Sequence, residues 1–155
     1  VRRRWQDAIE PVEFGWTNAA KYADYSSRDM TLRPDAGRYE CGTLNTVGCY
    51  GQRAAIEFLL EVGIENIAPA VLSLADQMEQ GVRAKGYEVM VDRTGETGSG
   101  ILSFRHPSID CRTLVSDLRH NKITAAPRQG WVRVSPHFYV GPEDIEQVLR
   151  LLPRA

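Results

Sequence analysis

The chain has 155 residues, 43% of them hydrophobic, and a formal net charge of −1. This composition excludes a disordered chain and argues against a partner that is nucleic acid or an acidic membrane surface. No apolar run approaches the roughly 18 residues of a membrane span. The three cysteines, an odd number without paired spacing, predict reduced thiols in a cytoplasmic protein: Cys41, Cys49 and Cys111.

Residues 1–45 are predicted to be irregular, because prolines and glycines interrupt them and few apolar positions recur periodically. Exposed Trp5, Phe14 and Trp16 on this arm would suit contact with another domain. The chain begins at Val1 and not at a methionine. We therefore expect the arm to be the end of a larger domain, and the chain to be a piece of a longer protein.

Two helices are predicted next. Apolar residues cluster on one face from Asn45 to Leu60, and Gly63 is a plausible helix stop. From Ile64 to Gly86 apolar residues recur at steps of three and four, which indicates an amphipathic helix. Tyr87–Val91 and Ile101–Phe104 then predict two strands. The glycine-rich segment between these strands, Gly95–Gly100, is expected to be a hairpin turn and not a phosphate-binding loop, because no helix follows it.

The remaining elements complete a small domain, residues 46–155. Asp110 is expected to cap a helix, and Lys122–Pro127 to form a short edge segment. Trp131–Ser135 predicts a third strand, and a last helix is expected to begin near Gly141. The order helix, strand, strand, helix, strand, helix predicts an α+β fold, in which an antiparallel sheet is covered by helices on one face.

Two arginines near the end of the sheet are the first candidate binding residues. Arg128 is expected in the loop before the third strand, and Arg133 inside that strand, on the face opposite Val132 and Val134. An arginine in such a strand needs a partner. The spacing leaves two interpretations open: Arg133 forms an ion pair within the protein, or its fork binds a ligand carboxylate.

A second candidate is the stretch Arg38–Gly48, RYECGTLNTVG. Thr43 or Asn45 could simply be the N-cap of the following helix. Alternatively, Thr43 and the neighbouring backbone could hold a phosphate at the helix N-terminus. Metal binding is not expected, because none of the three histidines has a partner at ligand spacing: His106, His120 and His137.

RYECGTLNTVG, SGILSF and GWVRVSPHFY, in this order and each followed by a helix, resemble the C-terminal portion of the class V aminotransferase family. The resemblance implies a pyridoxal-phosphate enzyme of fold type I, acting on an amino acid as a homodimer. Residues 1–45 would end the large cofactor-binding domain, and residues 46–155 would be the small C-terminal domain. Gly42 and Thr43 would contact the cofactor phosphate of the partner subunit. Arg133 would bind the substrate carboxylate, with Arg128 nearby.

Two departures from the family matter. The family's catalytic lysine is expected well upstream of RYECGT, and Lys21, Lys85 and Lys122 do not match it, so we expect no catalytic residue in this chain. Many cysteine desulfurases also carry a loop with a persulfide-forming cysteine between the two arginines, which is absent here. This favours an aminotransferase, an epimerase-like enzyme or a C–S or C–Se lyase. The alternative is a non-catalytic binding or dimerisation module with the same fold.

Overall fold

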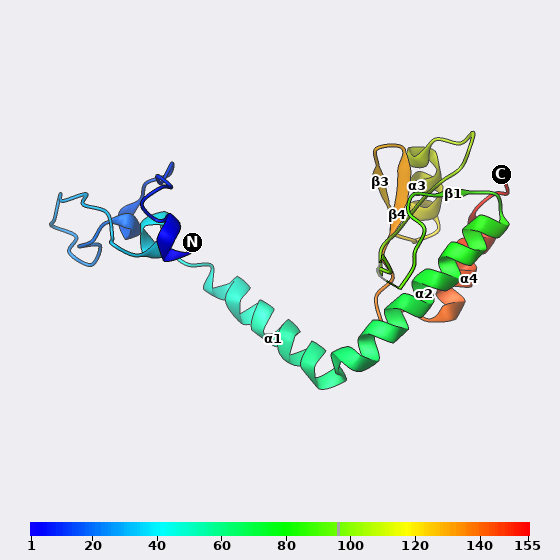
Figure 1. Cartoon of the computed structure of the whole chain (residues 1–155), viewed down its shortest axis with the longest axis horizontal. Coiled ribbons are helices and arrows are strands. Elements are labelled where there is room, and N and C mark those ends of the chain that lie inside the picture. The colour runs from blue at the N-terminus through cyan, green and yellow to red at the C-terminus, as the bar shows by residue number, and fades with distance from the viewer. Residues whose placement is uncertain (96) are drawn as a thin grey trace. The chain divides into compact units, whose positions relative to one another are not determined.

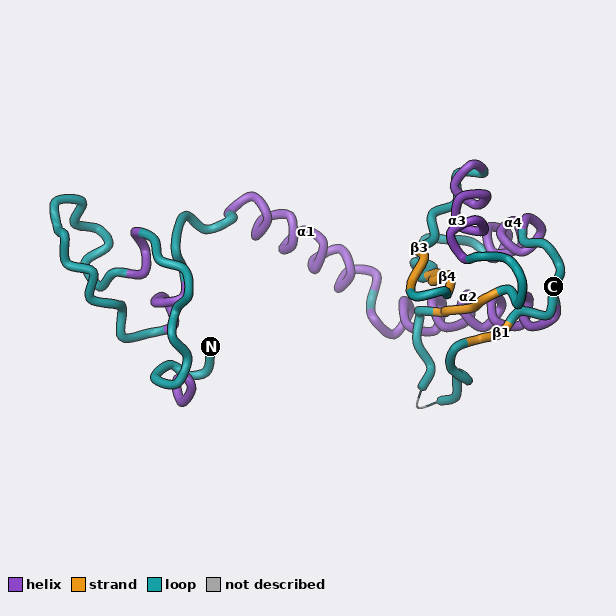
Figure 2. Tube along the Cα trace, turned by 90° about the horizontal axis from the view of Figure 1, so that it is seen from above, coloured by secondary structure: helices purple, strands orange, loops and turns teal. Residues whose placement is uncertain are grey.

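The computed structural model describes residues 1–95 and 97–155. The chain forms two compact units, Val1–Ala55 and Ile56–Ala155. The first unit consists of loops, short helical turns and the beginning of the long helix Thr46–Val62, whereas all the labelled strands lie in the second unit (Figure 2). The expected assignment of residues 1–45 to a large domain and of residues 46–155 to a small one stays a prediction.

The first unit is held together by polar groups. Its helical turns are short, Arg3–Trp5, Trp16–Asn18 and Ala36–Tyr39. Asn18 is fully buried between them: its Nδ2 donates to the Arg38 carbonyl at 2.7 Å, and its carbonyl accepts from the Arg33 N–H at 2.9 Å. A buried amide with these bonds fixes the surrounding backbone, because leaving any of its groups unpaired would be costly. Hydrogen bonds therefore order the segment that precedes Gly42.

Gly15 adds a steric constraint to the same segment. A Cβ atom at Gly15 would lie 1.7 Å from the Cys41 carbonyl oxygen, far inside contact distance. The Thr17 hydroxyl donates to the Glu40 carbonyl beside it. The backbone can approach Cys41 this closely because glycine has no side chain. Residues 15–17 thus support the residues immediately before Gly42 and Thr43.

Two helices follow, α1 (Thr46–Val62) and α2 (Ile64–Ala84), as the spacing of the apolar residues predicts (Figure 1). Gly63 separates them with a φ of +87°, a conformation that favours glycine. The expected helix stop at Gly63 is confirmed. Among the described residues no single helix is long and apolar enough to cross a membrane; α1 and α2 satisfy length and composition only as a bent pair.

The second unit contains a four-stranded antiparallel sheet in the order β1-β2-β4-β3 (Figure 1). The strands are β1 (Glu88–Val89), β2 (Leu102–Arg105), β3 (Ala126–Arg128) and β4 (Trp131–Val134). The predicted hairpin of the first two strands is confirmed. The predicted order missed one element, because the expected edge segment is a strand that continues past Pro127 to Arg128. Pro127 is tolerated there because β3 lies at the sheet edge.

Helices cover one face of this sheet and form the core with it. α2 and α3 (Cys111–His120) contact the strands, and α4 (Pro142–Leu151) packs against α2. Phe104 and Val132, which lie opposite each other on β2 and β4, are fully buried against Met78 of α2 and Leu118 of α3. A sheet with one buried face and one uncovered face explains the alternation of apolar and polar residues along its strands. The predicted α+β fold is confirmed.

A buried arginine fastens the β1–β2 connection to α2. The Arg93 side chain is only 4% exposed, and its guanidinium lies 2.7 Å from the Asp76 carboxylate and 3.6 Å from that of Glu79. It also donates to the Ser99 carbonyl at 2.6 Å. The predicted Gly95–Gly100 turn includes residue 96, which lies outside the described residues. The two ends of the connection are nevertheless fixed to α2 and to each other.

Tyr87 provides a test of the core. Its hydroxyl is buried without a hydrogen-bond partner among the described residues, and burial raises its pKa to about 12. Because the unfolded chain releases this proton at a lower pH than the folded protein, the ionisation of Tyr87 affects stability only above about pH 10, the pKa of tyrosine in the unfolded chain. The free energy of unfolding should therefore stay constant with respect to this group below about pH 10 and fall as the pH rises toward 12. We expect Tyr87→Phe to be as stable as the wild type or more stable at neutral pH, since it removes an unpaired hydroxyl.

Urea unfolding at about pH 9 and about pH 12 measures how much of the free energy of unfolding is lost between these two pH values. The Tyr87→Phe protein should lose less stability between these pH values than the wild type. The exposed Tyr139 supplies the control, because Tyr139→Phe should leave the wild-type loss unchanged. An equal alkaline loss in the wild type and in Tyr87→Phe would show that the hydroxyl is not desolvated.

The start of α3 provides a second test. The Asp110 carboxylate accepts from the Arg112 N–H at 2.8 Å, as expected for an N-cap. Asp110→Ala should lower the free energy of unfolding by about 1 kcal/mol. Asp117→Ala removes the same charge from the same helix without removing a cap, and should have little effect. If the two variants unfold at the same urea concentration, charge and not capping explains the contribution of Asp110.

Candidate functional site

The uncovered face of the sheet carries the residues that the sequence singled out. On β4, Val132 points into the core, so Trp131 and Arg133 lie on the opposite face. The register places Arg133 opposite Ser103 of β2 and opposite Ala126 of β3. Both neighbours are small, and Arg133 is half-buried. The predicted face of Arg133 is confirmed.

Arg133 has no acidic partner here. Within residues 1–95 and 97–155, its guanidinium makes neither a hydrogen bond nor an ion pair. Neither strand beside β4 places a carboxylate opposite it. Of the two interpretations that the sequence left open, the ion pair within the chain therefore has no support, and the carboxylate fork stays a hypothesis.

Arg128 lies in a different place from the one expected. It ends strand β3 instead of lying in a loop, and it is exposed opposite Trp131. The turn that joins β3 to β4 is only Gln129–Gly130, with φ values of +48° and +87°. Two residues with positive φ form the tight hairpin turn that matches the twist of the strands. This turn brings Arg128 onto the same face as Arg133.

A third arginine on this face was not found from the sequence. Arg105 ends β2, and its guanidinium lies 4.6 Å from the centre of the Trp131 ring. Its Nε also donates to the Glu88 carboxylate at 2.8 Å. Because Arg105 follows Ser103 by two positions, strand alternation could have placed it on the Arg133 face. The sequence alone did not show that Trp131 and Glu88 would engage it.

The second candidate, Gly42–Thr43, lies in the first unit at the start of α1. Asn45 is the N-cap, because its Oδ1 accepts from the Gly48 N–H at 2.9 Å. Thr43 is exposed and is not needed as a cap. Within the described part of the chain, the N–H groups of Thr43, Leu44 and Asn45 have no acceptor. A hydroxyl and free N–H groups at a helix N-terminus are suited to bind a phosphate.

Arg38 of the same stretch has a structural role. Its guanidinium donates to the Arg33 carbonyl at 2.9 Å and to the Gln6 carbonyl at 3.1 Å. These bonds connect the Ala36–Tyr39 turn to the beginning of the chain. Its charge is therefore engaged inside the first unit and does not contribute to the candidate phosphate site.

The family model for class-V aminotransferases matches residues 1–148. The chain belongs to the class-V aminotransferase family. Two curated relatives match almost the whole chain. An uncharacterized aminotransferase from Bacillus subtilis is 24% identical over 96% of the chain, and a probable cysteine desulfurase from Pyrococcus abyssi is 27% identical over 98%. The chain spans about two fifths of the length of each relative, 38% and 40%.

Solved structures show the same fold. The apo structure of a cysteine desulfurase from Thermococcus onnurineus matches 97% of the chain, and 40% of its own length is covered, with a TM-score of 0.81 and 22% identity. A variant of the enzyme C-DES, with glycine linked to its pyridoxal-phosphate cofactor, matches 96% of the chain and is covered over 39%, with a TM-score of 0.78 and 18% identity. The chain therefore shares the fold of these proteins over about two fifths of their length, 40% and 39%.

Two of the three lysines of this class-V chain make side-chain contacts within it. Lys21 pairs with Asp29 at 3.2 Å in the first unit. Lys85 is half-buried, and its Nζ donates to the Leu152 carbonyl at 2.8 Å. Lys122 follows α3 in a left-handed conformation with a φ of +62°. In the described part of the chain, Lys21 and Lys85 thus contact other residues, and Lys122 belongs to the turn after α3.

The histidines and cysteines likewise do not form a shared site. His106 is buried, where its Nδ1 accepts from the Ser108 and Ile109 N–H groups and its Nε2 lies 3.2 Å from the Arg154 carbonyl. The ring thus joins the β2–α3 turn to the end of the chain. Cys111 is buried in the core. Among the described residues no three His, Cys, Asp or Glu side chains converge as metal ligands.

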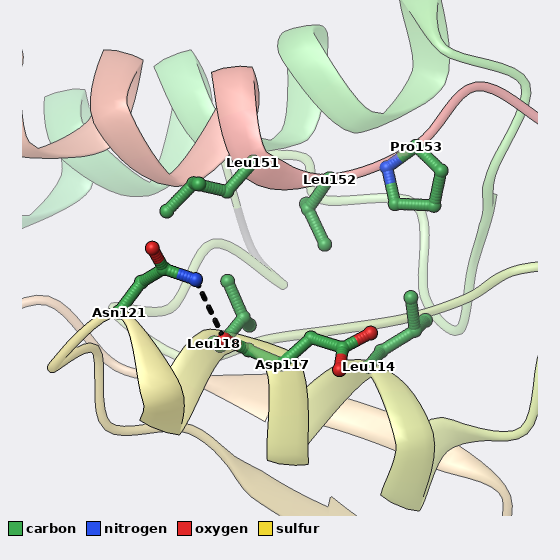
Figure 3. Close-up of a pocket in the computed structure, with 7 residues that line it drawn as sticks. All are labelled: Leu114, Asp117, Leu118, Asn121, Leu151, Leu152 and Pro153. Carbon is green, nitrogen blue, oxygen red and sulfur yellow. Dashed lines mark hydrogen bonds between the residues drawn. The ribbon is translucent and has the colours of Figure 1, made fainter.

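Two cavities of the second unit are lined by described residues other than Arg128 and Arg133. Figure 3 shows a small one of about 30 Å³ between α3 and the end of α4, where Asn121 donates to the Asp117 carbonyl at 2.9 Å. A larger groove lies between α4, residues 121–124 and residues 134–140. Arg128 and Arg133 lie instead on the uncovered sheet face, so this half of the candidate site is a surface that the chain itself does not close.

Proposed function

We propose that this chain is the C-terminal part of a pyridoxal-phosphate enzyme that acts on an α-amino acid, and that Arg133 binds the substrate α-carboxylate. The observation that carries this proposal is that the guanidinium of Arg133, between Ser103 and Ala126 on the uncovered sheet face, has no partner among the described residues. A guanidinium fork is matched to a carboxylate in shape and charge. Holding the carboxylate there would orient the bonds at the α-carbon for reaction.

The start of α1 fits the cofactor phosphate. Thr43 offers a hydroxyl, and the free N–H groups of Thr43, Leu44 and Asn45 offer further donors. A Cβ at Gly42 would meet no atom within 4 Å, so the space beside this backbone is open. When bound, pyridoxal phosphate supplies the capacity to withdraw electrons from the α-carbon. Gly42 and Thr43 would hold its phosphate, and the catalytic lysine would come from residues outside this chain.

The enzyme is proposed to be a homodimer, in which Thr43 serves the cofactor of the partner subunit. Helix α1 supports this proposal, because none of its residues is buried although many are apolar. Exposed apolar residues on a helix need a covering surface. They include Val47, Tyr50, Ile56, Phe58 and Leu60. In a whole protein, the large domain and the second subunit would supply that surface.

The β3–β4 turn narrows the reaction class. A loop able to carry a persulfide-forming cysteine between the arginines would have to replace the Gln129–Gly130 turn, whose two residues close the hairpin directly. The nearest cysteine in sequence, Cys111, is buried in α3. We therefore propose transamination, epimerisation or direct C–S or C–Se lysis, and not a persulfide relay from this position.

A second candidate is a binding or dimerisation module without catalysis. The observation in its favour is that Ile56–Ala155 forms a compact unit with its own core. Such a module would need no cofactor. Stoichiometric binding of pyridoxal phosphate by the whole protein would therefore exclude it.

Arg133→Gln in the whole enzyme tests the first proposal. Loss of a charged two-point contact should remove about 2 to 3 kcal/mol of binding, which raises KM for any α-amino acid substrate on the order of 100-fold. Arg112→Gln, on the exposed side of α3, is the matched control and should leave KM unchanged. Steady-state kinetics decides the matter: an unaltered KM in Arg133→Gln rules out the carboxylate role.

Gly42→Ala tests the cofactor site separately. Because a Cβ at Gly42 meets no atom of the described chain, the substitution should leave the thermal unfolding midpoint unchanged. It should weaken pyridoxal-phosphate binding, since the methyl group would occupy the space next to the phosphate. Fluorescence titration of the cofactor measures this affinity. Gly15→Ala is the control: its Cβ clashes with Cys41, so this variant should lower the unfolding midpoint. If Gly42→Ala and the wild type bind the cofactor with equal affinity, the phosphate does not lie beside Gly42.

A further inference from the structure

Three arginines share the uncovered sheet face, and they differ in what engages them. The cross-strand register places Arg105, Trp131 and Arg128 in one row, with Trp131 between the two arginines. Arg133 lies in the next row, between Ser103 and Ala126. Three like charges on one small face are unfavourable unless anions offset them. The question is which of the three charges the chain itself offsets.

The positive charge of Arg105 is offset by other residues of the protein. Its Nε donates to the Glu88 carboxylate at 2.8 Å, and its guanidinium lies 4.6 Å from the centre of the Trp131 ring. Both contacts use the planar shape of the guanidinium, one through its edge and one through its face. Arg105 is therefore committed to holding Trp131 and Glu88 in place.

The positive charges of Arg128 and Arg133 are not offset by any described residue. Within residues 1–95 and 97–155, neither guanidinium has a hydrogen bond or an ion pair. Arg128 is opposite Trp131, and Arg133 is two residues farther along β4, so the two arginines are diagonal neighbours on one face. Diagonal neighbours in an antiparallel pair are roughly 7–8 Å apart. Two long side chains at this spacing can reach the same small molecule.

The position of Arg128 is fixed by the backbone. It ends β3 immediately before the Gln129–Gly130 turn, whose positive φ values close the hairpin in two residues. A tight hairpin restricts the strand register, so the spacing between Arg128 and Arg133 is set by the sheet and not by a mobile loop. The two forks are thus presented together before any ligand arrives.

We propose that Arg128 binds a second acidic group on the side chain of the same amino acid whose α-carboxylate Arg133 holds. The substrate class is then the acidic α-amino acids, with a side-chain carboxylate or a similar anion. This inference rests on the proposed function, because it needs Arg133 to bind the α-carboxylate. A dianionic ligand offsets both free charges, whereas a neutral side chain leaves Arg128 without an anionic partner.

The experiment uses the full-length protein with pyridoxal phosphate. Rates are compared for L-aspartate against L-asparagine and for L-glutamate against L-glutamine, which differ in charge but little in shape. Binding of succinate and of its monoamide, succinamate, is measured by calorimetry, so that one readout does not depend on turnover. The variants are Arg128→Gln and Arg133→Gln, with Arg112→Gln of α3 as the control.

The wild type should prefer the acid to its amide in both readouts. Arg128→Gln should lower kcat/KM for the acidic amino acids and weaken succinate binding on the order of 100-fold, while the amides change by less than about threefold. Arg133→Gln should weaken acid and amide alike. Circular dichroism of each variant, matched to the wild type, confirms that the fold is retained.

Two results would overturn the inference while the proposed function stands. One is an Arg128→Gln variant that affects acids and amides equally, or affects neither, although Arg133→Gln weakens both. The other is a wild type that does not prefer acids to amides in either readout. If Arg133→Gln weakens no ligand at all, the proposed function itself fails, and the inference fails with it.

Discussion

The burial of only one face of a small sheet is the constraint on which this structure depends. Phe104 and Val132 anchor that face against α2 and α3. Because successive residues of a strand point to opposite faces of the sheet, burying these two residues places Arg105 and Arg133 on the other face. A slip of β4 by one residue against β2 would turn the Arg133 guanidinium into the core without a partner, at a prohibitive cost. The core therefore determines the side on which the arginines are presented.

The uncovered face is ordered although helices do not pack on it. Trp131 is held by the Arg105 guanidinium, which Glu88 holds in turn, and the Gln129–Gly130 turn fixes the edge strand. These contacts use polar and aromatic groups, because the face has too few aliphatic residues for an apolar layer. A surface of this kind remains wettable and can still bind a small charged ligand, or another domain that brings one.

The first unit achieves order by different means. Its described residues bury almost no large apolar side chain, and Asn18 occupies the centre that a hydrophobic residue would occupy in a domain. Hydrogen bonds from Asn18 and Arg38 to the backbone, with the close approach of Gly15 to Cys41, define the path that leads into α1. Such a polar framework specifies a conformation but contributes little hydrophobic stabilisation. It suits a segment whose apolar surface, including Trp5 and Phe14, is covered by other parts of a protein.

The sequence by itself determined the helices and the family. Apolar spacing placed α1, α2, α3 and α4 to within about two residues, because helix periodicity and caps such as Asp110 are local properties. It also placed Arg133 on the face opposite Val132. The tertiary structure alone decided that no acidic side chain among the described residues pairs with Arg133, that Arg128 ends a strand, and that Arg105 engages Trp131. These facts depend on cross-strand register and on a two-residue turn, which bring together residues that are distant in the sequence, and no local pattern encodes such contacts.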